Sequence, residues 1–274
     1  MDMEPRCGTS VIHHPGVTLP IEGLPMTRVS YSELAEQVAG GCIIVTTGFS
    51  ELGYQFPGEV EGRVERLVAH AAQSAGSSVE RLFLVSGGTR DGGICDITYG
   101  TADALKKRQG ASRRLEIVTV GLASATAQVE GVGFHDVDLL CLVEPLKPGS
   151  WEVAAPNGRS LTVDLVTRAR CGLLVAFRGG AVTAKELGEA IETSAICIVH
   201  QGDAFRPNPQ KVVDSMSKLE ADHVEAGSIS AQIAERVYAN NIPRGIYIAG
   251  KRVSTDPDAL EALPNFDTAR TTSI

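Results

Sequence analysis

Two glycine-rich loops in this sequence carry residue types that bind phosphorylated ligands. Gly87, Gly88 and Thr89 follow one apolar run, and Gly179 and Gly180 follow another. Glycine lets the backbone approach an anion and turn its N–H groups inward, while the N-terminus of a following helix attracts negative charge. Glycines also make ordinary tight turns between strands and helices, so a glycine pair alone leaves both interpretations open.

The second loop has further polar residues around its glycines. Arg178 precedes them with a guanidinium group, and Thr183 and Glu186 follow in the first turn of a predicted helix. A guanidinium, a glycine-rich backbone and a helix N-terminus together are typical of a phosphate site. The spacing from Thr183 to Glu186 is also that of a capping box, in which the glutamate bonds only to the helix end. The pattern therefore leaves Glu186 open between a ligand contact and a cap.

A third loop lies at the end of the apolar run CIIVT. It contains Thr47, Gly48 and Ser50. Hydroxyl groups at a strand end suit hydrogen bonds to phosphate or ribose, although such residues are common in loops of every kind. Together the three loops predict a site for a nucleotide-like small molecule.

Other chemically capable side chains lack obvious partners. His200 ends a predicted strand and is expected to be a hydrogen-bonded structural residue, because no nucleophile or metal motif accompanies it. Tyr99 and Trp151 are able to stack on a base, although a lone aromatic residue more often packs in a core. We predict no metal site and no cofactor.

The cysteines predict a reducing environment. All six are scattered singly, without a CxxC pair or Cys/His ligand spacing. Cys42, Cys141, Cys171 and Cys197 lie in or beside apolar runs, where a reduced cysteine behaves as a small apolar residue. We therefore expect free thiols and a cytoplasmic location.

The overall composition excludes several classes of partner. The chain has 274 residues, a hydrophobic content of 43% and a net charge of -8. Nucleic acids and anionic membranes both require clustered Lys and Arg, so we predict neither as a partner. No segment reaches the roughly 18 apolar residues of a membrane span, and the N-terminus has no signal-peptide pattern.

Short β-branched runs alternate with amphipathic stretches between residues 28 and 253. This alternation predicts one α/β domain, with a Rossmann-like, doubly wound, mostly parallel sheet and helices on both faces. Ser30 and Glu33 have capping-box spacing at the start of one helix. Apolar residues at helical spacing cover 214–241, and 245–253 is a candidate last strand. Residues 1–27 are predicted to be an irregular arm, and residues 254–274 a polar tail.

The order of the three loops resembles that of the SLOG superfamily. This superfamily includes the LONELY GUY phosphoribohydrolases, the proteins mislabelled as lysine decarboxylases, and related nucleotide-sensing domains. The resemblance spans roughly residues 42–205. The family pattern GGxGTxxE is met at Gly179, Gly180, Thr183 and Glu186, and the pattern GGxxxG at Gly87, Gly88 and Gly92.

The resemblance implies a Rossmann-like domain that forms a homodimer or a higher homo-oligomer, with phosphate on the second glycine loop. In the enzyme branch, the motif glutamate and an arginine from the preceding helix cleave the N-glycosidic bond of a nucleoside monophosphate. Carried over, Glu186 is the catalytic residue. A carboxylate in that place stabilises the cation-like sugar of the transition state.

Some positions depart from the family pattern. Arg178 replaces its proline, and Val182 replaces the glycine before the threonine. The Arg-Lys pair of the enzyme branch is missing, and Arg168 and Arg170 lie later on the preceding helix. The sequence thus predicts an N-glycosidase that releases a base from a nucleoside monophosphate. The alternatives are a sensor that binds a nucleotide-derived signal without turnover, and a purely structural domain.

Overall fold

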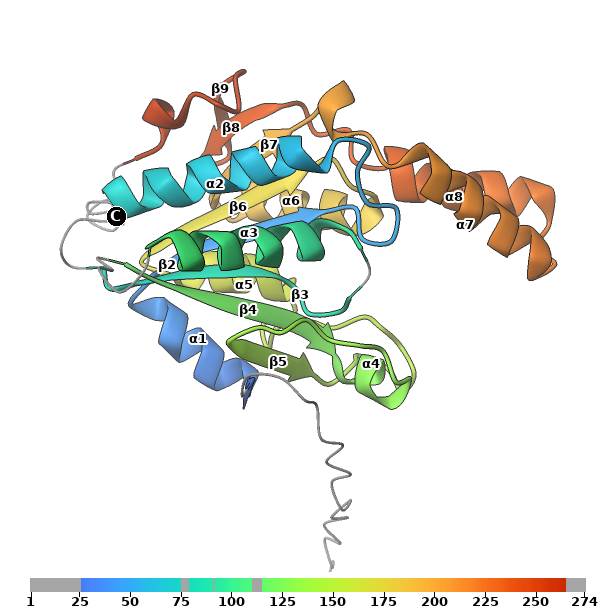
Figure 1. Cartoon of the computed structure of the whole chain (residues 1–274), viewed down its shortest axis with the longest axis horizontal. Coiled ribbons are helices and arrows are strands. Elements are labelled where there is room, and N and C mark those ends of the chain that lie inside the picture. Colours follow the sequence, from blue (N-terminus) through green and yellow to red (C-terminus); the bar gives the residue numbers. More distant parts are fainter. Residues whose placement is uncertain (1–25, 75–78, 91, 110–114, 265–274) are drawn as a thin grey trace, which may run out of the picture.

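The computed structural model describes residues 26–74, 79–90, 92–109 and 115–264, and a single sheet crosses this part of the chain (Figure 1). Its strands are β1 (Thr27–Val29), β2 (Cys42–Gly48), β3 (Arg81–Gly87), β4 (Glu116–Ser124), β5 (Leu139–Val143), β6 (Cys171–Phe177), β7 (Ile196–His200), β8 (Gly245–Ile248) and β9 (Lys251–Ser254). Their order is β1-β5-β4-β3-β2-β6-β7-β8-β9. Strands β1 to β7 run parallel, while β8 is antiparallel to β7 and β9 to β8.

Helices cover both faces of the sheet. They are α1 (Tyr31–Ala39), α2 (Pro57–Ser74), α3 (Ile94–Gln109), α4 (Ala125–Val129), α5 (Leu161–Arg168), α6 (Ala181–Glu192), α7 (Pro209–Ala221) and α8 (Ala226–Tyr238). Apolar residues of α2 and α3 pack in one core on one face, and those of α1, α5 and α6 in a second core on the other. The predicted Rossmann-like α/β fold, mostly parallel and covered on both faces, is confirmed.

Local sequence accounts for most helix and strand ends. At α1, the Ser30 backbone N–H donates to the Glu33 carboxylate at 2.7 Å, and the Glu33 N–H donates to Ser30 Oγ at 3.3 Å. The predicted capping box is thus confirmed there. The stretch 214–241 contains the last part of α7 and all of α8, because the chain turns at His223, which has a φ of 57°. The stretch 245–253 contains two strands, joined by Ala249 and Gly250 with φ of 49° and 74°.

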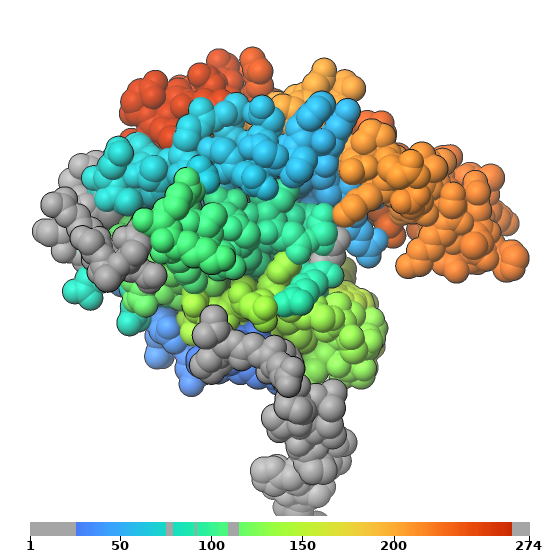
Figure 2. Space-filling view, viewed as in Figure 1, coloured from blue at the N-terminus to red at the C-terminus, as the bar shows by residue number. Residues whose placement is uncertain are grey.

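The C-terminal helices form a hairpin that stands out from the body. Figure 1 shows α7 and α8 side by side at one end of the molecule, and Figure 2 shows the same hairpin as a projecting lobe. Ile229, Ile233 and Val237 of α8 are buried, whereas no residue of α7 is fully buried. Both helices contact the body: the Lys211 ammonium of α7 donates to the Gly92 carbonyl at 3.0 Å, and Gly180 packs against Arg236 of α8.

Strand order reverses between β2 and β6. From β2 the chain moves outward through β3, β4 and β5, and α5 then returns it to β6 on the other side of β2. In doubly wound sheets, ligands bind at the carboxyl ends of the two strands that flank such a reversal. Two of the three predicted ligand loops follow these strands. One comes directly after Gly48, the last residue of β2, and the other contains Gly179, just after β6.

A buried tyrosine ties these two strand ends together. The Tyr54 hydroxyl donates to the Phe177 carbonyl at the end of β6 at 2.9 Å, and it accepts the Phe49 N–H at 3.0 Å. A Cβ at Gly48 would overlap the Tyr54 hydroxyl. Glycine is therefore required at the end of β2 by this packing.

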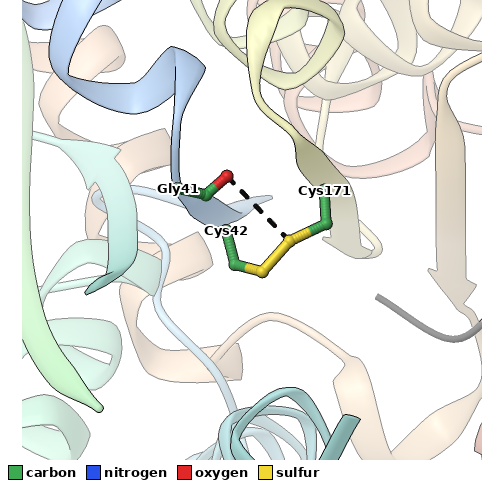
Figure 3. The surroundings of a disulfide bond; sticks show 3 residues. All are labelled: Gly41, Cys42 and Cys171. Carbon is green, nitrogen blue, oxygen red and sulfur yellow. Dashed lines mark hydrogen bonds between the residues drawn. A yellow bond between two sulfur atoms is a disulfide. The ribbon is translucent and has the colours of Figure 1, made fainter. Parts of the chain in front are cut away.

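A disulfide joins the opposite ends of the same strands. Cys42 and Cys171 are the first residues of β2 and β6 and face each other in the ladder, with their Cα atoms 4.6 Å apart (Figure 3). This separation lies within the range that a disulfide requires. The prediction of free thiols is wrong for these two residues, because strand register places them together across 129 residues of sequence. Cys95, Cys141 and Cys197 are buried and are not joined in a disulfide with any described residue.

The ends of the chain lie partly outside the described residues. Of the predicted arm, only residues 26 and 27 are described, and Thr27 already belongs to β1. Of the predicted tail, residues 254–264 are described, and Leu263 there is buried in a core. The division into arm, domain and tail stays a prediction. Within the described ranges, none of the helices has the length and apolar character needed to cross a membrane.

Reducing the Cys42–Cys171 disulfide is expected to lower the free energy of unfolding by about 2–4 kcal/mol, because the bond restricts the unfolded chain. Urea unfolding with and without dithiothreitol measures the change. In the Cys42→Ala/Cys171→Ala variant, dithiothreitol should have no effect. Alkylation of both cysteines in denatured, unreduced protein would show that the bond does not form.

Candidate functional site

A cavity of about 460 Å³ lies at the carboxyl ends of β2 and β3, beside the first turns of α6. Of the residues that the sequence singled out, it brings together Thr47, Gly48, Ser50, Gly87, Thr89, Thr183 and Glu186. Further lining residues come from the segment after β5 and from the start of α5, among them Trp151, Ser160 and Thr162. The wall is rich in hydroxyl groups, and it suits a ligand with several hydrogen-bonding groups.

The Glu186 carboxyl group lies at the centre of the hydrogen bonds in this cavity. Its Oε2 accepts from the Thr47 hydroxyl at 2.5 Å, and its Oε1 accepts from the Thr162 hydroxyl at 2.7 Å. The hydroxyls of Thr47 and Thr183 are 3.1 Å apart. Threonines of β2 and α5 therefore hold the carboxyl group of Glu186, a residue that is only 9% exposed.

Burial controls the protonation of this carboxyl group. It raises the pKa of Glu186, and the hydrogen bonds from Thr47 and Thr162 lower the pKa by less. Each carboxylate oxygen is able to accept about two hydrogen bonds, and each receives one from a threonine. The group therefore retains capacity to accept two further donors, such as neighbouring hydroxyls of a sugar.

The capping-box interpretation of Thr183 and Glu186 is wrong. Helix α6 starts at Ala181 with Gly180 as its N-cap, and no side chain caps it. Thr183 is therefore the third residue of the helix rather than its N-cap. Glu186 lies in the next turn, where its carboxyl group faces Thr47 and Thr162 instead of the helix end. The first turn of α6 borders the cavity through Val182 and Thr183.

The guanidinium of Arg178 does not line this cavity. Arg178 has a φ of 52°, and its Nε donates to the Gln201 side chain at 3.3 Å. Its carbonyl accepts from the Asn240 side chain at 2.7 Å. The positive charge of Arg178 thus lies beside Gln201, and its backbone beside Asn240, rather than in the cavity.

Close packing explains the glycines of the second loop. Gly179 has a φ of 101°, and a Cβ there would overlap the Thr183 side chain. A Cβ at Gly180 would lie 2.6 Å from the Arg236 carbonyl of α8. In the first loop, Gly88 packs on Leu140 and is not among the residues that line the cavity.

Three aromatic side chains that the sequence singles out lie in different places relative to the cavity. His200 is buried outside the cavity and stacks on Phe177 with ring centroids 4.9 Å apart. Burial lowers its pKa to about 3, and its Nδ1 has no hydrogen-bond partner among the described residues, so packing defines its role. The buried Tyr99 hydroxyl donates to the Val120 carbonyl at 2.6 Å. Only Trp151 of the three lines the cavity, and it is 46% exposed.

Sequence reasoning missed Thr162 as a site residue. It lies inside a predicted helix, and nothing in its neighbours marks it. Arg168, on the same helix, bonds to Asp164 at 2.5 Å and lines a separate groove beside Tyr31. Among the described residues that line the cavity, Lys185 is the one cation. An arginine opposite Glu186 is thus not part of this wall.

Neither a scan of protein-family models nor a search of curated proteins finds a match to this chain. The resemblance to the SLOG superfamily therefore rests on the motif residues alone. Across the described ranges, no group of three or more His, Cys, Asp or Glu side chains is placed to hold a metal ion.

The stability of Glu186→Gln relative to the wild type is expected to increase as pH rises. Because the pKa of Glu186 is raised in the folded state, that state binds the proton more tightly than the unfolded chain does. The wild type therefore loses stability as pH rises from about 4.5 through the folded-state pKa. The loss is about 1.4 kcal/mol for each pH unit that separates the folded-state and unfolded-state pKa values. Glutamine does not titrate.

Urea unfolding of both proteins across this pH range measures the difference. Glu192→Gln, at the exposed end of α6, is the matched control and should show no such trend. A stability difference between wild type and Glu186→Gln that stays constant with pH would contradict the raised pKa.

Proposed function

We propose that this protein binds a nucleoside 5′-monophosphate, or a close relative of one, in the cavity between the carboxyl ends of β2 and β3 and the start of α6. The observation that carries the proposal is the Glu186 carboxyl group, held by Thr47 and Thr162 on the wall of that cavity. A buried carboxyl group with spare acceptor capacity is suited to the paired hydroxyls of ribose.

Other residues of the cavity wall are suited to the phosphate and to the base of such a ligand. The uncapped first turn of α6, with Thr183 and the nearby Ser50, offers N–H and hydroxyl donors to a phosphate. Lys185 adds a positive charge at the same wall. The exposed face of Trp151 offers a stacking surface for the base. Phosphate, ribose and base thus each have a matching group.

Binding is expected to depend on Glu186 and on the ribose hydroxyls. By titration calorimetry, Glu186→Gln should weaken the binding of a nucleoside monophosphate by about 10- to 100-fold, because hydrogen bonds to a charged group contribute about 1.5–3 kcal/mol. The 2′-deoxy nucleotide should bind the wild type more weakly than the ribonucleotide, and this preference should vanish in Glu186→Gln.

The same titrations contain a pH test. Hydroxyl donors stabilise the ionised carboxylate, so binding releases a proton from Glu186, and the affinity of the wild type relative to Glu186→Gln should increase with pH. Comparison with the variant cancels the ionisation of the ligand phosphate. Glu192→Gln should bind like the wild type. Equal affinity of wild type and Glu186→Gln at every pH would end the proposal.

Hydrolysis of the N-glycosidic bond is a second candidate function. Its specific support is again Glu186, because a carboxylate beside the sugar stabilises the cation-like transition state while water attacks. We rank it after binding, because the guanidinium of Arg168 is directed to Asp164 and not to this cavity. Binding requires no such partner.

For this candidate, incubation with a panel of nucleoside monophosphates should release free base, measured by chromatography. Glu186→Gln should slow the release by on the order of a hundredfold, because the transition state loses its stabilising charge. Release at an unchanged rate in Glu186→Gln, or no release of any base, ends this candidate and leaves the binding proposal in place. Self-association and a cytoplasmic location stay predictions.

A further inference from the structure

A second cavity adjoins the proposed nucleotide site. It also measures about 460 Å³, and it lies between the loop after β2, the first turn of α6 and helix α8. It shares four lining residues with the nucleotide cavity: Gly48, Ser50, Val182 and Thr183. The two cavities therefore meet at the start of α6, where the proposed phosphate position lies.

The wall contributed by α8 is fixed in place. Gly180 packs directly against the backbone of that helix, since a Cβ there would lie 2.6 Å from the Arg236 carbonyl and 2.9 Å from the Glu235 carbonyl. The Arg236 guanidinium donates to Ser215 of α7 at 3.1 Å and lies 3.7 Å from the Glu51 carboxylate. Contacts of α8 with Gly180, with α7 and with the loop after β2 thus hold this wall of the second cavity.

Its polar groups differ in kind from those of the nucleotide cavity. Arg236 supplies a positive charge, while Glu51, Glu235 and Gln232 supply hydrogen-bond acceptors. Arg236 suits a phosphate, whereas the two carboxylates repel a long run of phosphates and attract hydroxyl donors. The wall therefore matches a single further phosphate followed by a group with several hydroxyls.

We infer that the ligand of this protein is a nucleoside diphosphate joined to a sugar, with the nucleoside in the first cavity and the second sugar in the cavity beside α8. This inference rests on the proposed function, because the first cavity must hold the nucleoside. The two phosphates cross the start of α6 between Ser50 and Thr183, and Arg236 contacts the second phosphate. Glu51 and Glu235 accept the sugar hydroxyls.

Titration calorimetry of the full chain tests the inference with matched ligands. For each of the four common bases, the monophosphate, the triphosphate and the diphosphate-glucose are compared. With the preferred base, the diphosphate-glucose should bind at least about tenfold more tightly than the monophosphate, and more tightly than the triphosphate. Arg236→Gln and Glu235→Gln should each remove most of this gain while leaving monophosphate affinity within about twofold.

Glu225→Gln, at the exposed start of α8 and away from the cavity, is the control and should keep the gain. If the monophosphate binds and the diphosphate-glucose binds no more tightly, the inference is wrong and the proposed function stands. Tightest binding of the triphosphate, or a gain that survives in both Arg236→Gln and Glu235→Gln, also overturns it. If no ligand binds, the proposed function falls together with the inference.

Discussion

The pairing of β2 with β6 is the constraint on which the rest of the structure depends. These strands come from distant parts of the chain, and strand order reverses between them. The Cys42–Cys171 disulfide joins their first residues, and hydrogen bonds of the Tyr54 hydroxyl to Phe49 and Phe177 join their carboxyl ends. Because both ends are held, the loops that follow the two strands emerge in a fixed relation, and both proposed cavities open between them.

Glu186 shows how this frame produces a chemical property. Its carboxyl group accepts one hydrogen bond from Thr47 of β2 and one from Thr162 of α5. Burial raises the pKa of this carboxyl group above its ordinary value, and the hydrogen bonds from the two threonines lower it by less. The same packing that secures the fold thus places a buried hydrogen-bond acceptor where we propose that the sugar binds, and helix α8 adds a second polar wall next to it.

The sequence predicts the sheet, its covering helices and the three loops well, because each depends on local hydrophobic pattern and glycine content. It predicts contacts between distant segments poorly. The disulfide depends on strand register across 129 residues, and Thr162 lies within an ordinary helical pattern. The predicted cap at Thr183 is wrong because Gly180 is the N-cap of α6, and Gly180 packs against α8, which comes about 50 residues later in the chain.

A crystal structure with a bound nucleoside monophosphate would show whether Glu186 binds the ribose of a nucleotide. We expect the 2′- and 3′-hydroxyls within hydrogen-bond distance of the Glu186 carboxyl group, and the phosphate at the start of α6 beside Thr183. A nucleotide bound elsewhere on the molecule, or one whose ribose lies away from Glu186, would show that Glu186 does not bind the ribose.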